Sequence, residues 1–112
     1  MKPPALNRRL VLEDKIATPD GHGGRSFEWS TVGTLWAEVL PRTGREVNGE
    51  AGAQSLTGFR VTVRAAAPGH SGRPVAGQRL RMGERLLMIK SVTEATGLDQ
   101  YLTCIAEEEL SL

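Results

Sequence analysis

The stretch from Thr31 to Pro41 constrains the fold of this 112-residue chain more than any other part of the sequence. Alternate positions along it form an apolar set and a mixed set: Leu35, Ala37 and Val39, and Trp36, Glu38 and Leu40. This period of two is typical of a β-strand whose side chains leave both faces of a sheet. Because the mixed set also contains large apolar residues, we expect the strand to be central in its sheet or covered on both faces. Proline has no backbone N–H donor, so we expect Pro41 to end the strand.

Similar patterns recur along the rest of the chain. They cover residues 8–16, 27–30, 59–64, 78–82, 85–92 and 99–107. Thirteen glycines and six prolines separate these segments, which favours many short strands and turns over long helices. We therefore predict a single all-β domain over residues 1–112, folded as a small antiparallel β-barrel or sandwich of about six strands.

Two segments fit none of these strands. Residues 1–6 contain two adjacent prolines and are expected to form a flexible arm. Residues 43–58 form the longest excursion between two strands. Thr43 and Glu46 have the spacing of a helix capping box, whereas each of the two glycines inside the segment weakens a helix by about 1 kcal/mol. We expect a long loop with room for one short helix.

Charge and cysteine content exclude several classes of protein. Lys and Arg total 14 against 13 Asp and Glu, and this balance argues against a protein that coats nucleic acid. The longest apolar runs, such as Leu86–Ile89, are too short to cross a membrane, and residues 1–6 lack the apolar core of a signal peptide. The single cysteine, Cys104, cannot form an intrachain disulfide, so we expect a soluble protein that folds in a reducing compartment.

The residues that most often carry chemistry do not form a recognisable catalytic set. His22 and His70 lie in separate glycine-rich loops without neighbouring metal ligands, so we interpret both as solvated loop residues. Cys104 lies in a strand pattern and is interpreted as a small buried hydrophobic residue. The glycine clusters match no phosphate-binding motif. The sequence therefore predicts no catalytic residue, no metal site, no cofactor and no enzymatic activity.

Charged residues share faces on the predicted strands. Arg60 and Arg64 share one face, Arg79 and Arg81 share another, and an acidic run closes the last strand. Each pair is interpreted either as an ordinary solvated face or as a surface that contacts another subunit or nucleic acid. The candidate interface residues are Arg60, Arg64, Arg79, Arg81, Glu107, Glu108 and Glu109.

Several short segments also follow one another in a characteristic order. They are Arg8-Arg-Leu-Val-Leu12, Asp20-Gly-His-Gly-Gly24 before Trp29, Thr34-Leu-Trp-Ala-Glu-Val-Leu-Pro41, Gly44-Arg-Glu46, Arg60-Val-Thr-Val-Arg64 and Leu86-Leu-Met-Ile-Lys-Ser-Val92. In this order, over nearly the whole chain, they resemble the head closure proteins of long-tailed phages, which are also called head–tail joining or stopper proteins.

The resemblance implies a small β-barrel that assembles into a homo-oligomeric ring, with a dodecamer as the expected copy number. Such rings lie in the virion below the portal and adaptor and above the tail terminator or tail tube. Double-stranded DNA passes through them without sequence-specific binding. Phages, prophages and gene transfer agents all use this component.

In the head closure family a long internal loop is associated with the channel, where in some members it helps to retain packaged DNA. The resemblance places this loop at residues 43–58. The implied channel residues are Thr43, Gly44, Arg45, Glu46, Asn48, Glu50 and Gln54. The chain departs from the family pattern at Gly49 and Gly52, where many relatives look like better helix formers.

The alternative function from the residues alone is a small SH3-like or OB-type β-barrel that binds a peptide or single-stranded nucleic acid. An OB-type site requires exposed aromatic residues on a basic face. Most of the five aromatic residues alternate as core positions, so we favour the structural connector.

Overall fold

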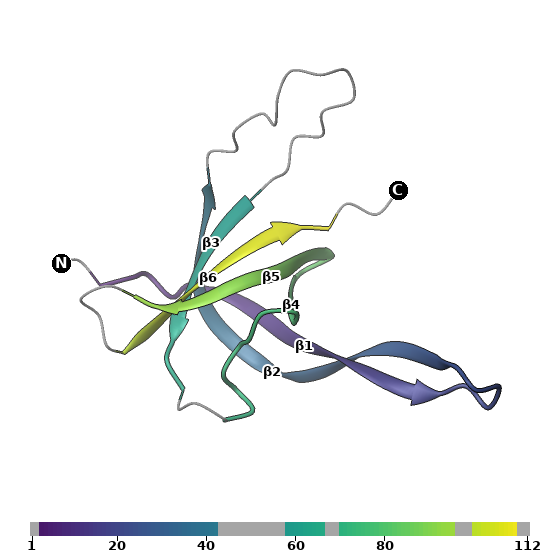
Figure 1. The fold of residues 1–112 in the computed structure, drawn as a ribbon. Helices are drawn as coiled ribbons and strands as arrows, with labels where there is room; N and C mark the ends of the chain where they lie inside the picture. Colours follow the sequence, from purple (N-terminus) through teal and green to yellow (C-terminus); the bar gives the residue numbers. More distant parts are fainter. Residues whose placement is uncertain (1–2, 43–57, 67–69, 96–99, 110–112) are drawn as a thin grey trace, which may run out of the picture.

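The structure, a computed structural model, describes residues 3–42, 58–66, 70–95 and 100–109. It contains six antiparallel strands (Figure 1), which are β1 (Arg8–Pro19), β2 (Arg25–Arg42), β3 (Gly58–Arg64), β4 (Arg79–Met82), β5 (Arg85–Glu94) and β6 (Tyr101–Glu108). The strands pair in the order β1-β2-β3-β6-β5-β4. Pairing between the first and last of these, β1 and β4, closes the sheet into a barrel. The described residues include no helix. The predicted all-β fold is confirmed.

One face of every strand fills the interior of the barrel. The apolar alternation of β3 puts Val61 and Val63 inside, and their partners on β6 are Cys104 and Leu102. Leu80 of β4 lies opposite Leu12 on one side and Leu87 on the other. The buried hydrophobic residues are Leu10, Leu12, Ala37, Phe59, Val61, Val63, Leu80, Met82, Leu87, Ile89, Leu102, Cys104 and Ala106.

The second strand differs from the prediction in length. Residues 27–30 and 31–40, predicted as separate segments, are parts of the single 18-residue strand β2. Pro41 does not end the strand, because it still pairs with Phe59 of β3. Beyond Ala37, β2 pairs only with β3. One edge of β2 is therefore unpaired at Pro41, and proline is tolerated at such edge positions because no N–H donor is needed on that side.

The outer face of β2 is open in the described structure. The strand is central, since it pairs with β1 and β3, but Trp36 is 57% exposed and Leu40 is 47% exposed. A closed barrel has one interior, and no other described layer covers its outer surface. Coverage of the second face, which the sequence suggested as an alternative, is therefore not observed.

The paired strands β1 and β2 continue beyond the barrel as a projecting hairpin, residues 13–31 (Figure 1). The pairing of β4 with β1 ends at Glu13, so the six remaining residues of β1, roughly 20 Å of the β1–β2 ribbon, have no third strand beside them. Ile16 alternates in the sequence with Leu10 and Leu12, which are both buried. It is instead 45% exposed, because it lies on the same face but past the end of the barrel.

An extra residue in β2 marks the base of the projecting hairpin. Leu12 pairs with Gly33 and Glu13 pairs with Thr31, which leaves Val32 as a β-bulge. After the bulge the core side of β2 carries odd-numbered residues, whereas before it the same side carries even-numbered residues. The alternation along β1 does not change. As a consequence, Trp36 and the odd-numbered residues before Val32 lie on the same outer face of the sheet.

A glycine-rich turn at the hairpin tip joins β1 to β2. Asp20 Oδ1 accepts hydrogen bonds from the backbone N–H groups of His22 (2.7 Å) and Gly24 (3.0 Å). Gly21 and Gly23 have φ angles of 81° and 83°, which glycine adopts without strain. These contacts close the turn between β1 and β2.

Residues 43–57 lie outside the described residues, so the predicted loop and its short helix stay predictions. The two ends of this segment are fixed beside each other, since Arg42 pairs with Gly58. Of the predicted N-terminal arm, residues 1–2 also lie outside the described residues. The backbone N–H of Ala5 donates a hydrogen bond of 2.9 Å to Glu38 Oε2.

We expect Leu102→Ala to reduce the free energy of unfolding by about 2–5 kcal/mol, because it leaves a cavity in the barrel interior. The matched variant Leu40→Ala removes the same atoms from the outer face and should change it by no more than about 0.5 kcal/mol. Urea unfolding of the purified monomers measures both values, and equal losses would contradict the assignment of the two faces.

Candidate functional site

A cluster of charges joins the projecting hairpin to the barrel. The register of β1 and β4 places Glu13 opposite Arg79. Glu13 is 3% exposed, and its Oε1 accepts a hydrogen bond of 2.5 Å from Arg79 Nε. Arg81 Nη2 lies 2.8 Å from Glu13 Oε2. The Arg79 guanidinium also lies 4.2 Å above the ring of Trp29, so the barrel and the hairpin share this cluster.

The shared cluster gives the hairpin a fixed base. Two guanidinium groups compensate the one buried carboxylate, and the stacked ring of Trp29 covers Arg79 from the hairpin side. A cation over an aromatic face is stabilised further when it is shielded from water. The arrangement is therefore suited to holding the direction of the hairpin rather than to catalysis.

A second ion pair closes the other end of the barrel. Arg85 donates two hydrogen bonds, of 2.7 and 2.8 Å, to the carboxylate of Glu108. Its guanidinium lies 5.2 Å from the ring of Phe59, which is buried. The hydrogen bonds from Arg85 hold the pKa of Glu108 below its ordinary value and raise the pKa of Arg85.

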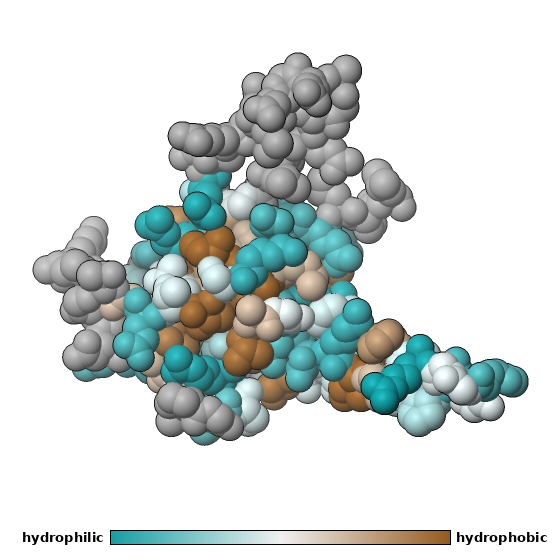
Figure 2. All heavy atoms as spheres, in the orientation of Figure 1, coloured by the Kyte–Doolittle hydropathy of each residue, from teal (hydrophilic) through white to brown (hydrophobic). Residues whose placement is uncertain are grey.

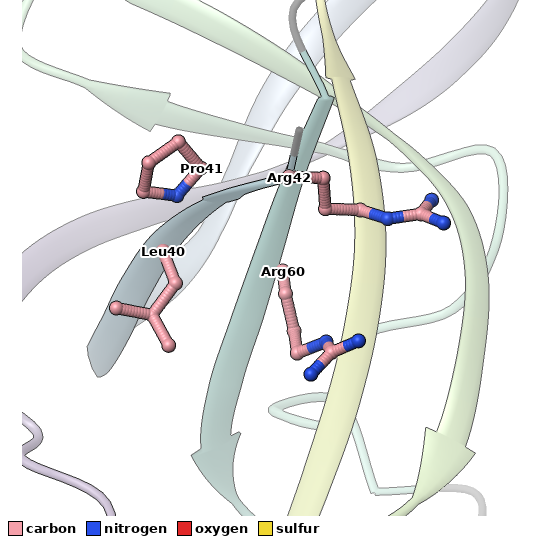
Figure 3. Close-up of a pocket in the computed structure, with 4 residues that line it drawn as sticks. All are labelled: Leu40, Pro41, Arg42 and Arg60. Carbon is pink, nitrogen blue, oxygen red and sulfur yellow. The ribbon is translucent and has the colours of Figure 1, made fainter. Parts of the chain in front are cut away.

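The outer surface of β2 and β3 carries a hollow beside the Arg42–Gly58 pair. Its lining residues are Leu40, Pro41, Arg42 and Arg60 (Figure 3). The guanidinium groups of Arg42 and Arg60 extend toward the same side of the hollow. Within the described part of the chain, neither forms a salt bridge with a carboxylate. The hollow therefore offers apolar surface and two cations to an acidic group from outside the barrel.

The same outer face continues along β2 toward the projecting hairpin. Arg9 of β1 pairs with Trp36, and Leu40 pairs with Arg60. Arg64, farther along β3, lies with its guanidinium 5.6 Å from the ring of Tyr101. We call Arg9, Trp36, Leu40, Arg60 and Arg64 the basic outer face. Arg9 and Trp36 were not among the predicted interface residues, although their alternation with core positions was a usable signal.

Among the described residues, some of the predicted interface residues form salt bridges and others do not. Arg60 and Arg64 are exposed on β3, as their alternation predicted. Arg79 and Arg81 share a face of β4, but Arg79 is half-buried against Glu13.

The acidic run at the end of β6 is also divided. Glu108 is held by Arg85, whereas Glu107 pairs in register with Met88 and Gly58 of the neighbouring strands. Glu109 is exposed just after β6. An interface role for these residues stays a prediction. The predicted channel residues, Thr43, Gly44, Arg45, Glu46, Asn48, Glu50 and Gln54, lie outside the described residues.

The residues considered for catalysis are Cys104, His22 and His70, and the structure describes the surroundings of each. Cys104 is fully buried, and burial raises the pKa of its thiol to about 12, so the thiol is protonated at neutral pH. His22 and His70 are exposed, and His70 Nδ1 accepts a hydrogen bond of 2.9 Å from the N–H of Gly72. In the described ranges, no three side chains of the metal-binding types come together. Nor do these ranges contain a helix that could cross a membrane.

Comparison with known proteins identifies one family profile and two solved structures that are similar to this chain. The sequence profile described as phage head completion protein matches residues 1–109. A chain from the virion of a native gene transfer agent particle is 40% identical, with a TM-score of 0.82 over 98% of this chain and 100% of that one. The protein SF1141 from Shigella flexneri 2a has a TM-score of 0.74 over the full length of both chains and 19% identity, which supports the fold alone. No curated protein matches the sequence.

Replacing Glu13 with glutamine should leave Arg79 without its counter-charge and reduce the free energy of unfolding by about 3 kcal/mol. The control is Asp14→Asn, which changes the neighbouring exposed carboxylate and should have little effect. Chemical unfolding followed by tryptophan fluorescence measures both. A Glu13→Gln variant as stable as the control would contradict a structural role for the cluster.

The Arg85–Glu108 pair should make stability depend on pH. The pKa of Glu108 is lowered by folding, so the pair contributes in full above the ordinary glutamate pKa of 4.5 and is lost as the pH falls through the folded value. Glu108→Gln should lower stability at pH 7 and flatten the decline in acid. Thermal unfolding at a series of pH values measures this, and parallel pH profiles for the two proteins would count against the prediction.

Proposed function

The chain belongs to the phage head completion protein family, and from this premise we propose that it is a head–tail connector in the virion of a phage or gene transfer agent. This is the family predicted from the ordered sequence segments. The match over residues 1–109 carries the proposal. The 40% identity to a chain of a gene transfer agent virion supports it, since almost the whole of both chains is covered.

The finer proposal is a homo-oligomeric ring, a dodecamer, through which double-stranded DNA passes. The ring lies between the portal and adaptor on one side and the tail terminator or tail tube on the other. A net charge of +1 suits such a conduit, because many strong phosphate contacts would hold the DNA in place. The chemistry is positional, and the proposal includes no catalytic step.

In this proposal residues 43–57 extend toward the channel and help to retain packaged DNA. The support is the position of their two ends. Arg42 and Gly58 form the last residue pair of β2 and β3, so the segment leaves the barrel at one point. The barrel itself is complete without it, because all six strands and the buried core lie in the described residues.

The test replaces residues 43–57 with Asn-Gly, a two-residue connection that suits a hairpin closed by Arg42 and Gly58. We expect a folded monomer with a cooperative thermal transition. In a particle-producing strain, the variant should yield particles that lose DNA or lack tails. The measurements are the nuclease-protected DNA per particle and electron microscopy of the tails.

A control variant keeps the segment's length but replaces its charged residues Arg45, Glu46 and Glu50 with serine. It separates a need for length from a need for charge. Normal DNA retention and tail joining by the Asn-Gly variant would remove the segment from the mechanism, and absence of the chain from purified particles would remove the connector role.

One observation favours a second candidate, the small binding module. Only Phe59 of the five aromatic residues is buried, so the expectation that most of them lie in the core was wrong. Trp36 is exposed beside Arg9, which resembles the surroundings of a single-strand stacking site. Titration of the isolated monomer with a single-stranded oligonucleotide distinguishes the two. Quenching that is lost in Trp36→Phe would favour the binding module.

A further inference from the structure

The projecting hairpin has two chemically different faces. Residues that pair directly across the two strands share a face, and the face alternates along each strand. The register pairs Asp14 with Ser30 and Ile16 with Glu28 on one side. We call this side, which also holds Thr18 and Ser26, the acidic hairpin face. It carries two carboxylates, no cation and the exposed side chain of Ile16.

The opposite hairpin face is basic. Lys15 pairs in register with Trp29, and Ala17 pairs with Phe27. The Lys15 ammonium lies 4.5 Å from the ring of Phe27, which is 58% exposed. Glu13, the carboxylate at the base of this face, is already held by Arg79 and Arg81, whose guanidinium groups outnumber it. The two faces therefore differ in the sign of their charge.

The acidic hairpin face is on the core side of the sheet but beyond the core. Leu10 and Leu12 precede Asp14 and Ile16 on the same side of β1, and both leucines are fully buried in the barrel. In the described structure, nothing covers Ile16 in the same way. Figure 2 shows apolar side chains where the hairpin leaves the barrel and a hydrophilic tip. On the acidic hairpin face itself, the exposed side chain of Ile16 lies opposite Glu28 and one step along the face from Asp14.

The basic outer face has the complementary composition. Arg9 lies opposite Trp36 and Arg60 lies opposite Leu40, and both apolar side chains are about half exposed, with Glu38 between them on the same face of β2. The nearby carboxylate of Glu38 is occupied in part by the backbone N–H of Ala5. Positive charge around an apolar centre is therefore available for a partner with the opposite pattern.

We propose that the acidic hairpin face of one copy docks on the basic outer face of a second copy. The inference rests on the proposed ring and names the contact that builds it. A chain cannot make this contact with itself, because the two surfaces lie on opposite sides of the same sheet and at different ends of β2. Each copy offers one surface of each kind, which is the heterologous arrangement that generates rings.

Other occupants fit the basic outer face less well. The basic hairpin face of a neighbour would bring like charges together around Lys15 and the arginines. DNA would match the positive charge but would leave Ile16 and the acidic hairpin face without a partner. A second copy accounts for both surfaces at once, so the test treats DNA as the competing outcome.

The first experiment reverses charge on each surface in a particle-producing strain. We expect the pair Asp14→Lys and Glu28→Lys, and separately the pair Arg60→Glu and Arg64→Glu, to lower the yield of DNA-filled, tailed particles at least about tenfold. All four substitutions in one chain should restore the yield to within about threefold, because every contact again joins opposite charges. The substituted residues are exposed, so thermal unfolding of each monomer should match that of the unsubstituted chain.

The second experiment detects the contact directly. Ile16→Cys combined with Leu40→Cys in one chain should give a ladder of multimers when purified particles are treated with a flexible bismaleimide. The native Cys104 does not contribute, since its thiol is buried and protonated. Ile16→Cys alone should give no ladder. Ile16→Cys with Glu84→Cys, which places the second thiol on the exposed β4–β5 turn, is the matched control.

Three outcomes would overturn the docking contact. The first is a normal particle yield from both charge-reversed pairs. The second is a particle yield from the variant with all four substitutions that is no higher than that of either pair. The third is an equal ladder of multimers from the Leu40→Cys and Glu84→Cys combinations. DNA loss from the Arg60→Glu and Arg64→Glu pair that the hairpin reversal does not rescue would assign the basic outer face to DNA instead. Immunogold labelling of unsubstituted particles distinguishes failure of the docking contact from failure of the proposed function. A chain absent from the head–tail junction would refute the proposed function itself.

Discussion

The barrel closes through a ladder of only three residue pairs between β1 and β4. At this seam Leu12 and Leu80 meet on the core side of the sheet, whereas Glu13 and Arg79 meet on its outer side. A buried carboxylate is costly unless cations compensate it, and the four-residue strand β4 supplies two of them. The core, the base of the hairpin and the direction in which it projects all depend on this short contact.

The seam also explains which parts of the fold were accessible from sequence. Alternation with a period of two identified the strand segments, because local geometry alone sets that pattern. It did not show that Ile16 is exposed, since nothing near that residue in the sequence indicates that the pairing of β4 with β1 ends at Glu13. Pro41 was likewise misjudged, because its tolerance comes from an edge of β2 that exists only where β1 has not yet begun.

The candidate surfaces were predictable to a smaller extent. Exposure of Arg60 and Arg64 followed from alternation within one strand. Burial of Arg79 did not, because its carboxylate partner is 66 positions away in the sequence. The sequence likewise did not show how the acidic run divides. Glu108 forms an ion pair with Arg85, whereas Glu109 is exposed to solvent. Family membership was accessible because it depends on the order of several segments and requires none of these long-range contacts.

If copies assemble through the projecting hairpin, as proposed above, the bulge at Val32 would affect the dimensions of that assembly. A bulge increases the local twist of its strand, so it helps to set the angle at which the hairpin leaves the barrel. Where such a hairpin links one copy to the next, that angle becomes the rotation between successive copies. The rotation decides how many copies complete a circle and how wide its opening is. A single additional residue in one strand would then act as a gauge for the diameter of the conduit.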